Sequence, residues 1–194
     1  MKTIIISAGH NPSKSGASWK GTREHDEATK WINEIEAYLI KQVVKVVRVP
    51  TGSLTQKVKT VNRVSRAQQS IAVELHFNSA GEAYVQGNET LHHPSSVAGK
   101  ALAESFNGAF MERAQRYVVK DRGVKAGWYR MDRPGIIDFY GDEDGDEMPV
   151  YWLRATACPA LILEPCFMCQ LSDIEDDWIT VAHAIADSLI IAAV

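Results

Sequence analysis

Three polar residues that can bind or use a metal ion each end an apolar, strand-like run of the chain. His10 follows the run Ile4-Ile5-Ile6-Ser7-Ala8-Gly9, and His76 and Glu164 end two further runs. The carboxyl ends of buried strands gather along one edge of an α/β sheet, where such folds place their active sites. Two histidines and a glutamate at that edge therefore indicate a metal-dependent hydrolase.

Glu164 is the most informative of these residues. It follows Ala160-Leu161-Ile162-Leu163 and precedes Pro165, so it stands at the end of a buried strand, where an uncompensated carboxylate is costly. Such a carboxylate needs a metal, a catalytic task or a basic partner. The last of these alternatives is a salt bridge to Arg122 or Arg154.

A fourth candidate, Glu24, stands at the start of the first predicted helix. A carboxylate at that position also favours the positive end of the helix dipole, which is a purely structural explanation for it. His25 and Glu27 are close enough in sequence to compete with Glu24 as a metal ligand.

Together the four residues match the demands of a catalytic Zn²⁺ site. Two imidazoles and one carboxylate supply three protein ligands and leave the fourth position for water. The pKa of that water falls toward about 7, and a second carboxylate nearby can take its proton. We therefore expect His10, Glu24 and His76 to be the ligands. Glu164 is expected to act as the base and later as the acid toward the leaving amine.

Apolar runs and helical stripes predict the elements that position these residues. Strands are expected over residues 2–8, 43–49, 70–76 and 159–164. Helices are expected over residues 24–41, from a capping box at Ser53 and Gln56, over residues 96–116, and from a second capping box at Ser172 and Glu175. Residues 77–95 and 117–150 are predicted to be mostly loop. This alternation predicts one α/β domain with a central, mostly parallel twisted β-sheet and helices on both faces.

Composition excludes several classes of protein. A formal net charge of −3 argues against a nucleic-acid binder, because phosphate neutralisation needs a basic face. Nothing approaches the roughly 18 apolar residues that span a bilayer, so no membrane insertion is expected. Cys166 and Cys169 form a lone CxxC without a matching second pair, so these two and Cys158 are expected to be spectator thiols.

In their order along the chain, several short segments resemble the zinc-dependent N-acetylmuramoyl-L-alanine amidases of the Amidase_3 family. The segments that carry the resemblance are Ala8-Gly9-His10, Gly21-Thr22-Arg23-Glu24, Leu54 to Asn62, Glu74-Leu75-His76-Phe77-Asn78-Ser79, Gly87-Asn88-Glu89-Thr90, Arg122-Gly123-Val124-Lys125, Trp152-Leu153-Arg154 and Pro159-Ala160-Leu161-Ile162-Leu163-Glu164. Two positions depart from the family pattern. Glu74 replaces a small polar residue, where it either adds negative charge near the metal or faces a partner, and Pro165-Cys166 replaces small residues.

The resemblance implies a single catalytic amidase domain over residues 1–194, with no separate cell-wall-binding domain. It implies hydrolysis of the amide bond between N-acetylmuramic acid and L-alanine in peptidoglycan, with Glu24 favoured over its neighbours as ligand. Asn78 and Arg154 are candidates for substrate binding. The amino-terminal apolar stretch is too short for a signal peptide. A phage or prophage endolysin, held in the host cytoplasm before lysis and acting at the cell wall, fits these features; oligomeric state is left open.

Two other functions share these residues: a zinc amidohydrolase or peptidase acting on a small soluble amide, and a non-catalytic muropeptide-binding module. Residues 80–95 and 125–147 are expected to shape the substrate groove, in which aromatic residues either pack on substrate or belong to the core or rim. These aromatic residues are Trp128, Tyr129 and Tyr140. The acidic segment 142–147 is expected to be a solvated or rim loop. His92 and His93 are expected to be exposed in a loop, where binding of substrate or of a second metal is the alternative, and His183 is expected to be half-buried and structural.

Overall fold

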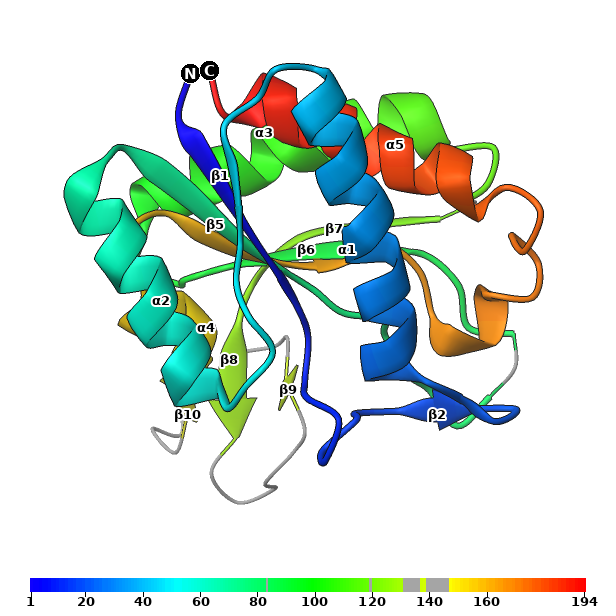
Figure 1. The fold of residues 1–194 in the computed structure, drawn as a ribbon. Helices are drawn as coiled ribbons and strands as arrows, with labels where there is room; N and C mark the ends of the chain where they lie inside the picture. The colour runs from blue at the N-terminus through cyan, green and yellow to red at the C-terminus, as the bar shows by residue number, and fades with distance from the viewer. Residues whose placement is uncertain (83, 119, 131–136, 139–146) are drawn as a thin grey trace.

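A six-stranded sheet runs through the centre of the protein, with its strands in the order β4-β1-β5-β11-β6-β7 (Figure 1). In chain order the strands are β1 (Thr3–Ala8), β4 (Val46–Arg48), β5 (Ser70–Leu75), β6 (Asn88–His92), β7 (Asp121–Ala126) and β11 (Ala160–Glu164). Neighbouring strands are parallel except for β11 and β6, which are antiparallel. The computed structural model describes residues 1–82, 84–118, 120–130, 137–138 and 147–194.

Helices cover both faces of this sheet (Figure 1). The first face carries α1 (Glu24–Lys41), α3 (Val97–Ala114) and α5 (Trp178–Ala192), and the second carries α2 (Leu54–Ala67) and the short α4 (Tyr151–Ala155). The predicted α/β domain with a mostly parallel sheet and helices on both faces is confirmed.

The alternation of side chains along β5 links this layering to the candidate site. Val73 and Leu75 are buried in the larger apolar core with α1, α3 and α5, whereas Ala72 packs with residues of α2 and α4. Because successive residues of a strand point to opposite faces, Glu74 lies on the same face as Ala72. The strand thus directs an acidic side chain toward α2.

Local sequence explains where the two helices nearest the site begin. The first turn of α1 contains Glu24, Asp26 and Glu27, whose negative charges favour the amino end of a helix. Helix α2 begins at the predicted capping box, in which the Ser53 hydroxyl accepts from the backbone N–H of Gln56 and the Gln56 side chain accepts from the backbone N–H of Ser53. Both predicted starts are confirmed.

Two predicted boundaries are wrong. The strand expected over residues 43–49 is limited to Val46–Arg48, because Val43 lies in the turn after α1 with a φ of 59°. The final helix begins at Trp178 rather than at the second capping box, Ser172 and Glu175. Successive turns occupy residues 171–177 instead, anchored by the buried side chain of Ile174.

Strands also form within the two segments predicted to be mostly loop. They include β6 and β7 of the main sheet and, in a separate small sheet, β8 (Trp128–Arg130), β9 (Ile137–Asp138) and β10 (Glu147–Pro149). A two-stranded hairpin, β2 (Ser18–Trp19) with β3 (Thr22–Arg23), precedes α1, and a 3₁₀ helix, Met168–Gln170, follows β11. Among the described residues, no helix has both the length and the apolar character needed to cross a membrane.

Candidate metal centre and adjoining cleft

The carboxyl ends of β1, β5 and β11 lie side by side and bring the candidate residues together. The backbone N–H of Gly9 donates to the carbonyl of Leu75 (2.7 Å), and the N–H of His76 donates to the carbonyl of Leu163 (2.9 Å). These bonds continue the parallel pairing beyond the strands. His10, His76 and Glu164 therefore meet at one edge of the sheet, as predicted.

Glu24, at the start of α1, bridges the two histidines. Its Oε2 lies 3.0 Å from Nε2 of His10, and its Oε1 lies 2.9 Å from Nδ1 of His76. One ligand atom from each of the three residues lies within 4.8 Å of the others. Two imidazole nitrogens and a carboxylate at this separation form a donor set of the kind that binds zinc.

Backbone groups hold this cluster in place. Glu24 accepts hydrogen bonds from the N–H groups of Ala17 (2.9 Å) and Phe77 (3.3 Å). His10 has a φ of 57°, a conformation uncommon for residues other than glycine, which a functional position can impose. A Cβ atom at Gly9 would lie 2.6 Å from the His76 ring, so the close approach of β1 to that ring requires glycine.

The cluster favours positive charge. Burial alone would raise the pKa of Glu24, but its hydrogen bonds with His10 and His76 and their charges outweigh burial and hold this pKa well below its usual range. Burial alone would lower the pKa of His76, but hydrogen bonds with Glu24 and Glu74 and their charges raise it well above its usual range. A site that stabilises a proton between carboxylates has the electrostatic character to accept a cation.

Glu164 stands beside this cluster as a second buried carboxyl. In the pairing of β11 with β5, Leu163 is opposite Leu75, so the next residues, Glu164 and His76, face the same side. Glu164 is buried, and its Oε2 has no hydrogen-bond partner among the described residues. Burial raises the pKa of this carboxyl to about 8, with the His76 charge opposing the rise and neighbouring carboxylates adding to it. Such a carboxyl can both accept and return a proton near neutral pH.

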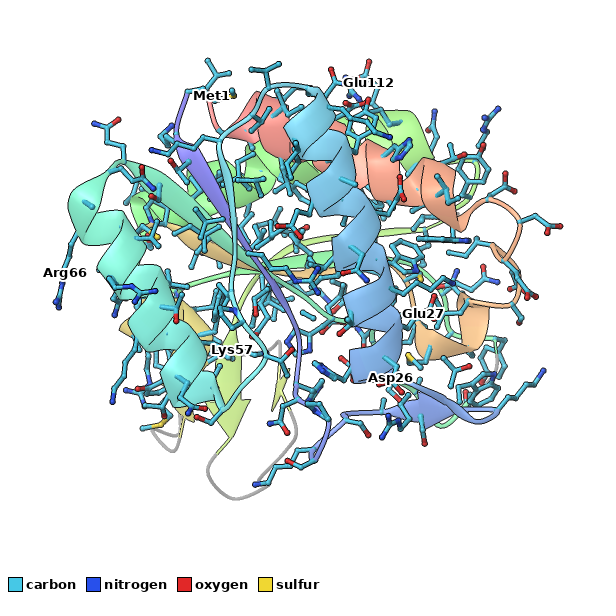
Figure 2. The ribbon with its side chains drawn as sticks, viewed as in Figure 1. Met1, Asp26, Glu27, Lys57, Arg66 and Glu112 are labelled. Carbon is cyan, nitrogen blue, oxygen red and sulfur yellow. The ribbon has the colours of Figure 1, made fainter. Side chains whose placement is uncertain are left out.

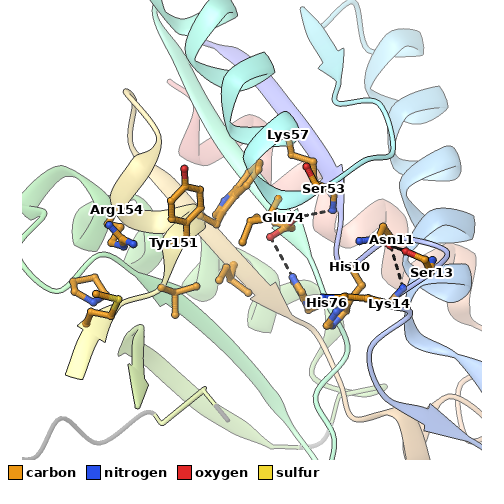
Figure 3. Close-up of a pocket in the computed structure, with 16 residues that line it drawn as sticks. His10, Asn11, Ser13, Lys14, Ser53, Lys57, Glu74, His76, Tyr151 and Arg154 are labelled. Atoms are coloured by element: carbon orange, nitrogen blue, oxygen red, sulfur yellow. Dashed lines mark hydrogen bonds and ion pairs between the residues drawn. The ribbon is translucent and has the colours of Figure 1, made fainter. Parts of the chain in front are cut away.

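A cleft of about 670 Å³ extends from the cluster toward α4 (Figure 3). His10 and His76 line one end, and Tyr151 and Arg154 line the other. The Arg154 guanidinium lies 5.0 Å from the centre of the Tyr151 ring. The cleft therefore joins the candidate metal centre to a cationic and aromatic end, and it is large enough for a substrate of drug-like size.

Residues 4–190 match the family model Amidase_3, described as N-acetylmuramoyl-L-alanine amidase. The chain belongs to this family. Enzymes of this description are hydrolases, and the family resemblance read from the sequence is confirmed.

Known proteins resemble this chain in sequence or in fold, at low sequence identity. The chain is 24% identical to an endolysin of Bacillus phage SPP1 over 130 residues, which cover 64% of this chain; it spans about half (47%) of that endolysin. N-acetylmuramoyl-L-alanine amidase AmiC2 of Nostoc punctiforme superposes with a TM-score of 0.75 at 22% identity, covering 97% of this chain and 95% of that one. The catalytic domain of the amidase CwlV from Bacillus (Paenibacillus) polymyxa var. colistinus gives a TM-score of 0.69 at 23% identity, covering 97% and 96%.

His25 and Glu27, the alternatives to Glu24 as a metal ligand, make other contacts. His25 Nδ1 lies 2.6 Å from the carbonyl oxygen of Gly9. Glu27 accepts from the side chains of Lys30 and Trp31, both at 2.9 Å. Within the described part of the chain, the geometry of this amidase-family site therefore places Glu24, and neither neighbour, between the histidines.

The salt bridge considered for Glu164 forms at a different glutamate. Arg122 and Lys125 both pair with Glu89, a fully buried residue of β6. Asn78, a substrate-binding candidate, donates its amide to Glu89 Oε2 (3.2 Å) and is not among the residues that line the cleft. Arg154, the other candidate, does line it. Local sequence does not mark Glu89 as a buried charge, because its neighbours Asn88 and Thr90 are polar.

The structure also places the other histidines and the cysteines that the sequence analysis named. His92 is buried, against expectation, with Nδ1 2.8 Å from the carbonyl of His93. His183 is half-buried and lies 2.7 Å from Glu34. The three cysteines are free thiols. Tyr140 and residues 142–146 of the acidic segment lie outside the described residues, as do the side chains of Tyr129 and Glu147.

Proposed function

We propose that this protein is a zinc-dependent N-acetylmuramoyl-L-alanine amidase that hydrolyses the amide bond between N-acetylmuramic acid and L-alanine in peptidoglycan. The observation that carries the proposal is the position of Glu164 beside the cluster of His10, Glu24 and His76. Glu164 is buried, and in the part of the chain that the structure describes its Oε2 has no hydrogen-bond partner. Membership of the amidase family supplies the class of substrate.

The three proposed ligands fit Zn²⁺. Two imidazole nitrogens and one carboxylate are the ligand types that catalytic zinc sites use, with a remaining position open to water. When bound there, zinc would polarise the scissile carbonyl and lower the pKa of the attacking water. The raised pKa of His76 adds support, because it reflects a site that stabilises positive charge.

Glu164 is the proposed proton carrier. It accepts a proton from the attacking water as the water oxygen bonds to the lactyl carbonyl carbon. It then gives that proton to the alanine nitrogen as the carbon–nitrogen bond breaks, which leaves a carboxylate on the muramic acid and an amine on the peptide. Its pKa of about 8 suits both directions of transfer. Arg154, at the far end of the cleft, is proposed to bind substrate there. For Asn78, which donates to Glu89, only the resemblance in sequence supports a role in substrate binding.

The biological setting we propose is that of a phage or prophage endolysin, present in the host cytoplasm before lysis and acting at the cell wall. The similarity to the endolysin of phage SPP1 supports it. Expression in a susceptible host, with and without a pore-forming protein, tests this setting. We expect lysis only when the pore is present, and lysis without the pore would indicate another route to the wall.

Digestion of purified peptidoglycan tests the activity. The zinc-loaded protein is expected to release amines at N-terminal alanine without new reducing ends, as read by mass analysis of the products. A chelator should abolish this release and added Zn²⁺ should restore it. Cleavage that ignores the chelator would overturn the metal assignment.

The two other functions predict different products. Hydrolysis of small N-acyl-alanine amides with no action on peptidoglycan would indicate a soluble-amide hydrolase. Peptidoglycan binding that is unaltered in Glu164→Ala, with less than one zinc per chain and no cleavage by either protein, would indicate a binding module.

A further inference from the structure

The ring of His76 has charged neighbours on both of its nitrogens. Nδ1 lies 2.9 Å from Oε1 of Glu24, within the candidate metal cluster. Nε2, on the opposite side of the ring, lies 3.3 Å from Oε2 of Glu74. Figure 3 shows Glu74 between His76 and Lys57. Because Glu74 approaches the nitrogen that points away from Glu24, it is placed to act on His76 rather than to join the same metal ion.

A buried lysine balances the charge of Glu74. Lys57 lies on α2 (Figure 2). Its Nζ donates to Oε1 of Glu74 at 2.9 Å and also to the carbonyl of Ala8. Lys57 and Glu74 are each only 3% exposed. Ser7, opposite Glu74 in the pairing of β1 with β5, adds a hydroxyl donor at 3.4 Å. Two charges that are buried this deeply persist only as a pair with further hydrogen bonds, which is the arrangement found here.

A carboxylate at one imidazole nitrogen determines what the other nitrogen can do. A neutral imidazole has one N–H group and one lone pair. A carboxylate accepts but cannot donate, so it holds the proton on the nitrogen it faces and leaves the lone pair on the other. Carboxylates that contact metal-bound histidines in this way fix the orientation of the ring and increase its affinity for the metal.

We propose that Glu74, with its charge balanced by Lys57, is a positioning residue that holds the proton of His76 on Nε2 and directs the Nδ1 lone pair into the metal site. This inference rests on the proposed zinc site. It assigns to the Lys57–Glu74 pair a role in metal affinity, distinct from the proton transfer assigned to Glu164.

Zinc affinity and the His76 proton together test the inference. In the zinc-loaded protein with ¹⁵N-labelled histidine, we expect a slowly exchanging Nε2–H resonance for His76. The double variant Lys57→Met/Glu74→Gln removes both charges of this pair together, so that neither is left buried without the other. It should retain the fold by circular dichroism, bind Zn²⁺ about 10- to 100-fold more weakly in competition with a chromophoric chelator, and lose the protection of that proton.

A matched control is available at a second carboxylate–histidine pair. Glu34→Gln removes the carboxylate that lies 2.7 Å from His183, remote from the metal cluster in the fold, and should leave zinc affinity and the His76 resonance unchanged. Zinc affinity that is unchanged in the double variant overturns the inference. If the double variant does not fold, the unmodified protein still decides, because a rapidly exchanging Nε2–H would overturn it as well.

The outcomes distinguish this inference from the proposed function. A wild-type protein that binds no zinc contradicts both. A protein that binds zinc and cleaves peptidoglycan, but whose zinc affinity and His76 resonance do not respond to the double substitution, contradicts only the role of Glu74.

Discussion

The buried carboxyl of Glu164 should make the protein less stable as the pH rises, and Glu164→Gln should remove this effect. The pKa of Glu164 is raised from an ordinary 4.5 to about 8 in the folded chain, with burial as the largest cause. Below pH 4.5 both the folded and the unfolded chain hold the proton. Between pH 4.5 and 8 the unfolded chain releases it while the folded chain retains it, so the free energy of unfolding falls with rising pH.

The size of the effect follows from the shift. One pKa unit corresponds to about 1.4 kcal/mol, so a rise from 4.5 to about 8 represents a loss of at most about 5 kcal/mol across that range. Glutamine resembles the protonated carboxyl in shape and cannot ionise. Glu164→Gln should therefore be nearly as stable as the wild type near pH 4.5 and several kcal/mol more stable near pH 8.

Urea unfolding of the metal-free protein at a series of pH values measures this difference. The variant should also lose peptidoglycan hydrolysis when reloaded with zinc, so that it gains stability and loses activity together. Glu175→Gln, at an exposed position in the turns before α5, is the control and should change stability by less than about 0.5 kcal/mol at every pH. A stability difference for Glu164→Gln that does not depend on pH would refute the reasoning.

Three further predictions concern the ligands, the backbone and the cleft. Glu24→Gln keeps the side-chain volume but removes the negatively charged metal ligand between His10 and His76. Zinc affinity measured by chelator competition should therefore fall, and an unchanged affinity would remove Glu24 from the proposed ligands. Gly16 has a φ of 78°, and in Gly16→Ala the added Cβ would also clash with the Glu24 carboxylate. The free energy of unfolding measured in urea should therefore fall by about 1–3 kcal/mol. No measurable fall would mean that the loop shifts freely. Arg154→Gln should raise KM for peptidoglycan without altering zinc content; an unchanged KM would exclude Arg154 from substrate binding.

The strands that lead to His10 and Glu164 were predictable because their runs of residues are mostly apolar. Every residue of β1 and β11 is buried and most are apolar, as expected for central strands that are covered on both faces. The polar residue that ends each run then marks the edge of the sheet. His10 and Glu164 could be placed together on this ground alone.

Strand β6 could not be predicted because its buried residues are mostly polar. Asn88, Glu89 and Thr90 are all within 1% of full burial. Their partners come from distant segments: Asn107 contacts both Asn88 and Thr90, and Arg122 contacts Glu89. Local sequence shows the polarity of these residues but not the partners that satisfy them.

The position of Glu74 illustrates a similar limit within the site. The sequence shows an acidic residue two positions before His76, which leaves open whether it adds charge near the metal or faces a partner. The structure places Glu74 between a partner and the candidate metal cluster, because Lys57 contacts one of its oxygens and His76 the other. Lys57 lies four residues before Val61, so its spacing fits the buried face of α2, but its partner depends on how α2 packs on β5.

Anomalous diffraction at the zinc absorption edge, from crystals of the zinc-loaded protein, tests the central claim most directly. We predict one strong peak at about 2.0–2.2 Å from a nitrogen of His10, an oxygen of Glu24 and Nδ1 of His76, with Glu164 close by but not bound to the metal. A zinc-loaded crystal with no peak among these three residues, or with the peak bound to a different set of side chains, would contradict it.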